Sequence, residues 1–203
     1  MTYPDAIRLQ KNIAKKVVAA KDDFGRISSI CGVDIAYGSG SNSNAAYCSA
    51  VIMDRNMQKL VESVDVQTIV KYPYVPGLLM LREAEPIFYT LKLLKNTYDL
   101  LLIDGHGLLH PRKCGLACYI GVTLDKPTIG VAKSRLCGMV RPDGFVELGG
   151  EILGYAISKK LYISVGHRVT LKTAIALVRE LGIEPLRLAD INSRINKKKS
   201  AAD

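Results

Sequence analysis

The stretch Tyr98–Gly121 reads YDLLLIDGHGLLHPRKCGLACYIG. Its apolar run, Leu100–Ile103, is too short for a buried helix and favours a buried strand in the centre of a sheet. An acid, Asp104, ends this strand, and two glycines then flank a histidine. Gly105 and Gly107 allow the main chain to turn sharply or to lie close to a ligand. The stretch therefore predicts a strand that presents a carboxylate at the edge of a sheet.

Basic residues follow this carboxylate within ten positions. His110, Arg112 and Lys113 are side chains of the kind that contact phosphate groups. A lone aspartate at the end of a strand is, however, more often a helix cap or a turn former. The stretch alone favours that structural interpretation, so the choice depends on the rest of the chain.

The composition is that of an ordinary globular protein. Its 203 residues are 48% hydrophobic and 23% charged, which predicts one domain, residues 1–203, with a substantial core. No apolar run approaches the length of a membrane span. The N-terminal segment is basic and lacks the apolar core of a secretory signal, so we expect a cytoplasmic protein without a membrane partner.

The charge balance bears on the partner. Lys and Arg number 28 against 19 Asp and Glu, a formal net charge of +9. Such an excess favours a polyanionic partner, of which nucleic acid is the commonest, although many basic proteins only carry solvated lysines. Charge by itself leaves these two interpretations about even.

Five cysteines without a CxxC pair predict reduced, mostly buried thiols. His110, Cys114 and Cys118 fall at helical spacing, which is one way to begin a zinc site. A structural zinc site takes four ligands, and no fourth ligand accompanies these three. The spacing therefore does not favour zinc.

The first half of the chain predicts a helix and then a sheet. An amphipathic helix is expected from Tyr3 to about Lys21. Three short strands joined by tight turns, Ile30–Tyr37, Ala45–Asp54 and Lys59–Val70, predict an antiparallel meander. The first of them carries Asp34, an acid that costs stability in an apolar strand unless it has a partner or a metal.

The second half alternates helices and strands. We expect a helix with Pro86 in its first turn, ending near Leu94, because proline is tolerated there. The later elements that the pattern predicts are a helix at Gly115–Gly121, strands at Thr128–Lys133, Phe145–Leu148, Ile152–Ser158 and Leu161–Val165, and helices at Leu171–Leu181 and Pro185–Ile195. Residues 193–203 are expected to form a frayed basic tail. These patterns indicate a mixed α/β domain.

Five segments carry a resemblance to one family. DGHGLLHPRKCGLA resembles the central motif of the endonuclease V family, whose members recognise deaminated bases in nucleic acid. Four more segments are similar to that family in the same order, namely GVDIAYG at 32–38, PYVPGLLMLRE at 73–83, TIGVAKSRLCG at 128–138 and SVGHRVTL at 164–171. The resemblance covers about residues 30 to 171. It implies an α/β, ribonuclease H-like fold with a mixed central sheet flanked by helices.

The resemblance assigns catalytic roles to five residues. Asp34, Glu83 and Asp104 correspond to metal-binding acids. Lys133 is expected to hold the scissile phosphate or to stabilise the transition state, and His167 to complete the metal site with the acids or to act in proton transfer. Three carboxylates that share a pocket need a compensating cation, and oxygen-only ligands favour Mg²⁺, with Mn²⁺ as a substitute. Considered singly, these residues are equally explained as a core aspartate, a helix N-terminal acid and surface side chains.

The loop PYVP suits nucleic acid for a physical reason. A tyrosine between prolines loses little entropy on binding, so Tyr74 can enter the base stack as the target nucleotide turns out. The resemblance implies a DNA wedge formed by Pro73, Tyr74, Val75 and Pro76. It also implies a base pocket lined by Gly77, Leu79, Gly105, Leu116, Gly130, Ala132 and Leu136, with phosphate contacts from His110 and Arg112.

The expected activity follows from the resemblance. It implies a monomeric DNA repair endonuclease that recognises deoxyinosine and hydrolyses the second phosphodiester bond 3′ to it, leaving 3′-hydroxyl and 5′-phosphate ends. Inosine in RNA is an alternative substrate, and a non-catalytic binder of deaminated nucleic acid is an alternative function. The chain departs from the common family pattern at Leu81 and at Tyr119, where a phenylalanine and a histidine are usual.

Overall fold

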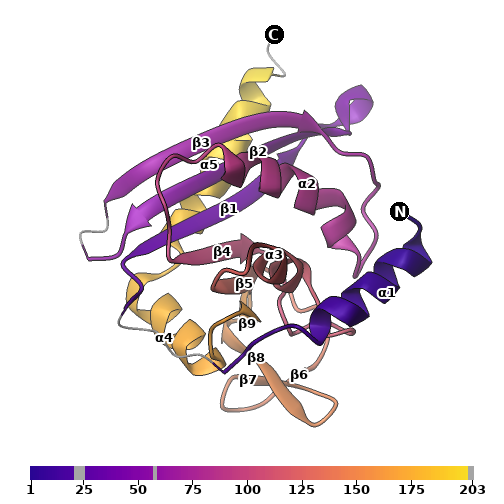
Figure 1. Ribbon diagram of the computed structural model, residues 1–203, viewed down its shortest axis with the longest axis vertical. Coiled ribbons are helices and arrows are strands. Elements are labelled where there is room, and N and C mark those ends of the chain that lie inside the picture. The colour runs from indigo at the N-terminus through magenta and orange to yellow at the C-terminus, as the bar shows by residue number, and fades with distance from the viewer. Residues whose placement is uncertain (21–25, 57–58, 201–203) are drawn as a thin grey trace.

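The computed structural model describes residues 1–20, 26–56 and 59–200. These residues form one mixed sheet of order β3-β2-β1-β4-β5-β9-β8-β7-β6, flanked by helices (Figure 1). The strands are β1 (Ser29–Tyr37), β2 (Ala45–Asp54), β3 (Leu60–Ile69), β4 (Leu100–Asp104), β5 (Thr128–Ala132), β6 (Met139–Val140), β7 (Phe145–Leu148), β8 (Glu151–Ser158) and β9 (Leu161–His167). The helices are α1 (Tyr3–Ala14), α2 (Leu79–Lys92), α3 (Leu116–Leu124), α4 (Leu171–Leu181) and α5 (Glu184–Ser200), with a short 3₁₀ turn, η2 (Gly40–Asn42). The predicted α/β class and the three-stranded meander are confirmed.

The centre of the sheet is parallel. β1 pairs with β4 and β4 with β5 in parallel register, whereas the other neighbours are antiparallel. Val33 is opposite Ile103, and Asp104 is opposite Val131. The carboxyl ends of parallel strands meet at one edge of a sheet, so this register brings Asp34, Asp104 and the residue after β5, Lys133, to the same edge.

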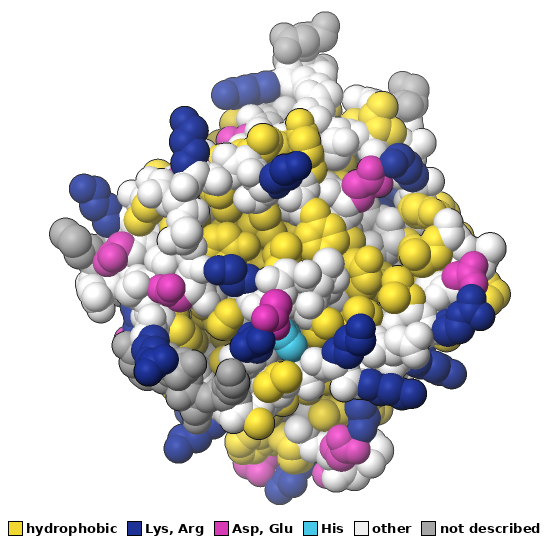
Figure 2. Space-filling view, in the orientation of Figure 1, with side chains coloured by type: hydrophobic (Ala, Val, Ile, Leu, Met, Phe, Trp, Pro, Cys, Tyr) yellow, Lys and Arg dark blue, Asp and Glu magenta, His cyan; other side chains and the backbone are white. Residues whose placement is uncertain are grey.

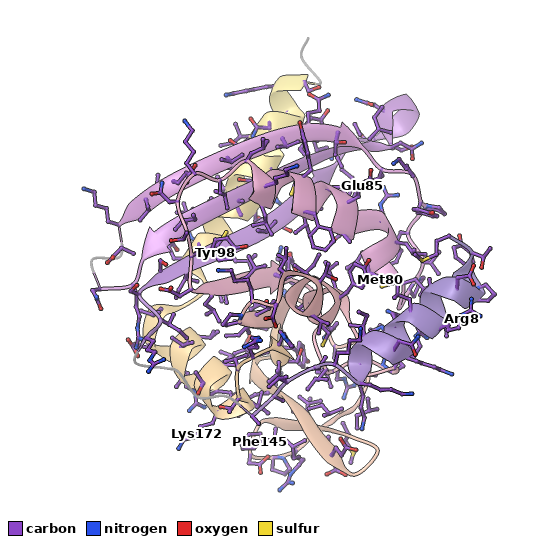
Figure 3. The ribbon with its side chains drawn as sticks, viewed as in Figure 1. Arg8, Met80, Glu85, Tyr98, Phe145 and Lys172 are labelled. Carbon is purple, nitrogen blue, oxygen red and sulfur yellow. The ribbon has the colours of Figure 1, made fainter. Side chains whose placement is uncertain are left out.

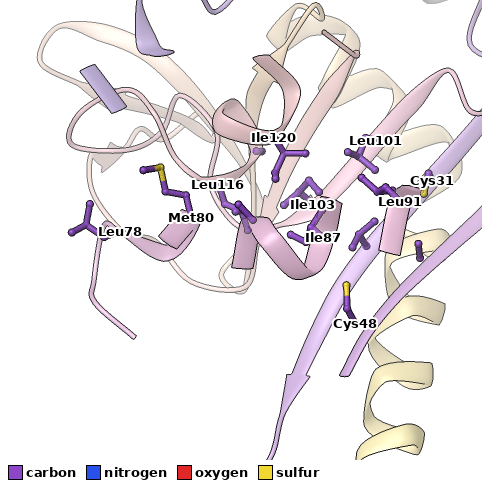
Figure 4. Packing of buried hydrophobic residues seen from close by; sticks show 14 of the residues in the cluster. Cys31, Cys48, Leu78, Met80, Ile87, Leu91, Leu101, Ile103, Leu116 and Ile120 are labelled. Atoms are coloured by element: carbon purple, nitrogen blue, oxygen red, sulfur yellow. The ribbon is translucent and has the colours of Figure 1, made fainter. Parts of the chain in front are cut away.

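Helices cover both faces of the sheet. On the face toward the viewer in Figure 1, α2 and α3 pack over β1, β2 and β4 through a buried apolar cluster that includes Ile87, Ile103 and Ile120 (Figure 4). On the other face, α5 packs over β1 and β2 and α4 packs over β8 and β9, and a second buried cluster there includes Ile129 and Leu177. Because both faces are buried, the central strands read as nearly continuous apolar runs.

Gly32 determines how closely α5 approaches the sheet. A Cβ atom at this position would lie 2.3 Å from the backbone nitrogen of Leu186, so only glycine lets the helix lie directly on β1. Leu186 is one turn before Asp190 on α5, and Gly32 is two residues before Asp34 on β1. The close contact therefore places Asp190 near Asp34.

Three predicted boundaries differ from the structure. α1 ends at Ala14 because the chain beyond it is drawn to β9, where Val18 bonds to Arg168 and His167 through its backbone. α2 begins at Leu79, so Pro86 lies inside the helix and not in its first turn. α5 continues to Ser200, so the prediction of a frayed tail was wrong for residues 193–200. Residues 201–203 lie outside the described residues.

The structure also bears on the helices, the cysteines and the surface charges. Within the described residues, no helix has the length and apolar character needed to cross a lipid bilayer. All five cysteines are unpaired, and four of them are buried, as predicted. Lys and Arg side chains are spread over the face shown in Figure 2, and Arg8 lies on the outer side of α1 (Figure 3).

Candidate active site

The three predicted acids and the predicted lysine line one cavity. Asp34 comes from β1, Glu83 from α2, Asp104 from the end of β4 and Lys133 from the residue after β5. The Lys133 Nζ lies 2.7 Å from Asp104 Oδ2 and 3.9 Å from Asp34 Oδ2. The fold therefore brings together four side chains that are separated by up to 99 positions, from Asp34 to Lys133.

A fourth acid, Asp190, joins them from α5. Carboxylate oxygens of Asp34, Asp104 and Asp190 all lie within 4.8 Å of one another. The Lys133 Nζ also lies 3.0 Å from Asp190 Oδ1. Sequence reasoning missed Asp190, because nothing in its local pattern distinguishes it from other polar residues of a C-terminal helix.

Asp34 and Asp190 share a proton in the absence of a cation. Burial raises the pKa of Asp34 to about 9, and the charge of Asp104 and a hydrogen bond with Asp190 add to this. Burial acts in the same direction on Asp190, but hydrogen bonds from Asp34, Arg194 and Lys133 outweigh it and hold the pKa of Asp190 well below its usual range. Asp34 therefore carries the proton and Asp190 the charge.

Glu83 is held by a tyrosine. The Tyr37 hydroxyl donates a hydrogen bond of 2.7 Å to Glu83 Oε1, and the Arg82 guanidinium lies 4.2 Å from the centre of the Tyr37 ring. Burial raises the pKa of Glu83 to about 7, although the bond from Tyr37 opposes the shift. The carboxyl group is thus oriented and only partly ionised at neutral pH.

Lys133 remains protonated. Burial lowers its pKa, but the hydrogen bond and charge of Asp104, together with Asp34 and Asp190, outweigh that effect and raise the pKa above its ordinary value. Its side chain is 56% exposed. A permanent cation is therefore available at the open side of the acids.

The cavity beside these acids has a volume of about 390 Å³. Six of the seven predicted base-pocket residues line it, namely Gly77, Leu79, Gly105, Leu116, Ala132 and Leu136. Tyr74 of the predicted wedge also lines it and is 63% exposed. The structure thus joins the predicted base pocket, an exposed aromatic side chain and the acidic cluster in one cavity.

Gly130 does not line this cavity, contrary to the prediction. A Cβ atom there would lie 2.6 Å from the Gly105 carbonyl oxygen and 2.6 Å from the Gly107 nitrogen. Gly130 lies behind the segment that follows Asp104, and its missing side chain lets that segment cross β5. Its effect on the pocket is therefore indirect.

His110 and Arg112 hold the pocket loop. His110 is buried, and its Nε2 donates to the Gly77 carbonyl oxygen at 3.1 Å. The Arg112 guanidinium donates to the same oxygen at 2.6 Å and to Gln10 Oε1 at 2.7 Å, while Gln10 Nε2 also bonds to Gly77. Three side chains thus fix the Gly77 carbonyl, and the phosphate contacts of His110 and Arg112 stay a prediction.

The chain is similar to known proteins over most of its length. The profile of the family described as Endonuclease V matches residues 11–191. The chain is 41% identical to Endonuclease V of Sulfurisphaera tokodaii, covering 95% of both chains, and 39% identical to Endonuclease V of Thermofilum pendens, covering 92% of this chain and 85% of that protein. The chain belongs to the endonuclease V family. It is therefore a nuclease by descent.

Solved endonuclease V structures share the fold. The Bacillus subtilis protein superposes with a TM-score of 0.90 at 26% identity, covering 100% of this chain and 94% of that chain. The Ciona intestinalis protein, solved with a 24mer DNA containing an inosine followed by a ribo-adenosine, has a TM-score of 0.85 at 26% identity and covers 97% and 98%. The mixed sheet flanked by helices is thus an endonuclease V fold, and the ribonuclease H-like label remains an interpretation.

His167, from the family's histidine-bearing segment, was predicted to be catalytic. Thr128, at the start of β5, pairs with His167, so His167 lies at the opposite end of that strand from Lys133, roughly 16 Å away at about 3.3 Å per residue. It is buried, accepts a 3.2 Å hydrogen bond from the Val18 nitrogen and contacts Asp125 Oδ1 at 3.2 Å. The prediction that it joins the acids was wrong.

Tyr119, which departs from the family pattern, is also remote from the acids. It lies on α3 with its ring 6.2 Å from that of Phe88 and lines a different cavity, beside α2. Leu81 lines that second cavity as well. Neither departure changes the acidic cluster.

The acids fit a divalent cation. Three carboxylate oxygens here lie within 4.8 Å of one another, and oxygen ligands of this kind suit a divalent cation. Lys133 is their shared cation but is half exposed, and Asp34 needs a proton to remain buried. Asp34, Asp104 and Asp190 are the residues that would hold a metal, with Glu83 beside them.

Proposed function

We propose that this chain is a Mg²⁺-dependent endonuclease, with Mn²⁺ as a substitute metal, that recognises deoxyinosine in DNA. It hydrolyses the second phosphodiester bond 3′ to the lesion and leaves 3′-hydroxyl and 5′-phosphate ends. The observation that carries the proposal is the convergence of Asp34, Glu83, Asp104 and Lys133 on one cavity that Tyr74 borders. The DNA in the Ciona complex, which contains an inosine, supports the choice of base.

The pocket suits recognition of a base by the main chain. Gly77 and Gly105 have φ angles of +77° and +152°, which glycine adopts without strain. With no side chain in the way, backbone groups can approach the edge of a flipped base. The exposed Tyr74 ring is available to fill the space that the base leaves in the stack.

The acids and the lysine divide the chemistry. A water oxygen bonds to phosphorus while the bond from phosphorus to O3′ breaks, and O3′ takes a proton from a solvent water molecule. Glu83, which Tyr37 orients, would help to hold the metal, and the proton of the attacking water passes to solvent. Lys133 stabilises the charge that develops on the phosphate oxygens. Mg²⁺, when bound, lowers the pKa of the water and neutralises charge on the leaving oxygen.

Inosine in RNA is a second candidate substrate. In the Ciona complex a ribo-adenosine follows the inosine, so a 2′-hydroxyl next to the base was compatible with binding in that protein. A 2′-hydroxyl is the group by which proteins distinguish RNA from DNA. The same acids would serve either substrate.

The test compares three labelled substrates. A duplex with one deoxyinosine, its undamaged counterpart and an RNA with one inosine are incubated with Mg²⁺ or EDTA. Wild type is expected to nick the deoxyinosine strand only with Mg²⁺, and Asp104→Ala is expected to lose at least 100-fold in rate. Asp65→Ala, which removes an exposed acid of β3, is the matched control and should cut normally. Cutting of RNA alone would move the function to RNA, and inosine-dependent binding without cutting would leave a binder.

A further inference from the structure

Helix α5 continues well beyond the acidic cluster. Asp190 is its seventh residue, and ten more residues follow to Ser200, a length of about 15 Å at 1.5 Å per residue. In Figure 1 this yellow end projects past β3, the edge strand of the sheet. A surface thus leads from the catalytic acids to the periphery of the molecule.

Cations follow Asp190 along one side of this helix. Arg194, Lys197 and Lys198 lie four, seven and eight residues after it, the spacing that places side chains on one helical face. Residues 191–200 contain four cations and no acid. The neighbouring face, with Ala189 and Ser193, is buried. We name Arg194, Lys197 and Lys198 the α5 stripe.

Arg194 links the stripe to the cluster. Its Nη2 lies 3.0 Å from Asp190 Oδ1, and its side chain is 64% exposed. A guanidinium has five N–H donors in a planar fork, so this contact leaves donors directed to solvent. Exposed guanidinium groups bind phosphate oxygens in a bidentate way.

The two lysines are available to a partner. Lys198 is exposed and Lys197 partly so, and neither takes part in the ion pairs found among the described residues. A membrane-binding helix would need an apolar face on the exposed side, whereas the exposed residues here are polar or charged apart from Ile195. The chemistry fits a polyanion.

We propose that the α5 stripe binds the phosphate backbone of the nucleic acid strand where it leaves the acidic cluster. This inference rests on the proposed nuclease function. Arg194 contacts the first phosphate beyond the cluster, and Lys197 and Lys198 contact the following ones. Arg194 and Lys198 are four residues apart, about 6 Å along the helix at 1.5 Å per residue, a spacing comparable to that of successive phosphates along a strand.

The test uses the full chain and the double variant Lys197→Gln/Lys198→Gln. Glutamine keeps helix propensity, so the fold is preserved. The control is Lys92→Gln/Lys95→Gln, which removes two exposed lysines near the end of α2. Anisotropy of a labelled single strand with one deoxyinosine gives affinity in EDTA at several salt concentrations. The magnitude of the slope of log K, the binding constant, against log[salt] should be smaller by about 1.4 in the double variant, because each lost phosphate contact accounts for about 0.7. The decrease should be smaller in the control.

Varying the length of the nucleic acid strand shows on which side of the deoxyinosine the α5 stripe binds. Lengthening the strand on one side of the deoxyinosine should strengthen binding by wild type and the control, but not by the double variant. An unchanged salt slope, or equal gains from lengthening in all three proteins, would overturn the α5 stripe while leaving the nuclease intact. If wild type neither binds nor cuts deoxyinosine strands, the proposed function itself fails, and the stripe fails with it.

Discussion

Replacing Asp34 by asparagine should make the metal-free protein more stable. Asp34 is 9% exposed, and its carboxylate shares a small space with Asp104 and Asp190. Asparagine keeps the shape of the side chain and can still donate a hydrogen bond to Asp190, but it carries no charge. The substitution therefore removes the ionised form of Asp34, which folding avoids only by protonating this carboxyl group.

The size of the effect follows from the distances. At 4.8 Å, with an effective dielectric constant of about 20, each pair of like charges costs about 3.5 kcal/mol. The Lys133 Nζ, 3.9 Å from Asp34, offsets about 4 kcal/mol on the same scale. The charge of Asp34 thus costs a net of about 2–3 kcal/mol, and the desolvation of its carboxylate adds to that.

The effect depends on pH in a defined direction. The pKa of Asp34 rises from 3.8 to about 9 on folding, so the folded state binds the extra proton and the stability of wild type falls as pH rises between these values. At pH 5 the cost is at most about 1.6 kcal/mol, because each unit above 3.8 contributes about 1.4 kcal/mol. At pH 7.5 it reaches at least about 2–3 kcal/mol. The advantage of Asp34→Asn should therefore grow between pH 5 and pH 7.5.

Thermal unfolding measures this directly. In EDTA at pH 7.5, Asp34→Asn should melt at least roughly 4–6 °C above wild type, at about 2 °C per kcal/mol for a chain of this length. Added Mn²⁺ should raise the melting temperature of wild type and close the gap. Asp65→Asn, the exposed control on β3, should leave both values unchanged. A variant that melts at or below wild type in EDTA would refute the reasoning.

Three further substitutions probe other contacts of the site. Tyr37→Phe removes the bond that orients Glu83, and the metal concentration for half-maximal cleavage should rise about 10–100-fold; an unchanged metal titration would contradict this role. Gly130→Ala introduces a clash at 2.6 Å with the segment after Asp104, so the single-turnover cleavage rate should fall at least 10-fold while the circular dichroism spectrum stays native. A cleavage rate equal to that of wild type would show that the segment shifts to accept the methyl group. His167→Gln should lower the free energy of unfolding by about 1–3 kcal/mol in denaturant titrations yet preserve the cleavage rate at saturating enzyme; loss of cleavage in the folded variant would restore a catalytic role.

Local sequence patterns predicted much of the fold. The buried strand ending in Asp104 and the antiparallel meander follow from apolar runs and turn residues that act within a few positions. The helix around Pro86 shows the limit of such rules, because packing of Ile87 and Leu91 against the sheet outweighs the preference of proline for a first turn. The end of α1 is likewise decided by bonds of Val18 to β9, which no local pattern contains.

The sequence by itself determined which side chains carry the chemistry. The motifs around Asp34, Glu83, Asp104 and Lys133 identified the acids and the lysine through the family resemblance, and Tyr74 through the stiff loop that holds it. These assignments depend on residue identity, which the chain displays directly. The structure places all five of these side chains around one cavity.

Only the tertiary structure decided which side chains meet. Asp190 joins the cluster because Gly32 lets α5 lie on β1, and His167 is excluded because β9 runs antiparallel to β5 and places it at the far end of that strand. Neither fact is encoded in the neighbourhood of either residue. Strand order, strand direction and the close approach of a helix to a sheet arise from contacts between distant segments, and these contacts set the distances on which charge and catalysis depend.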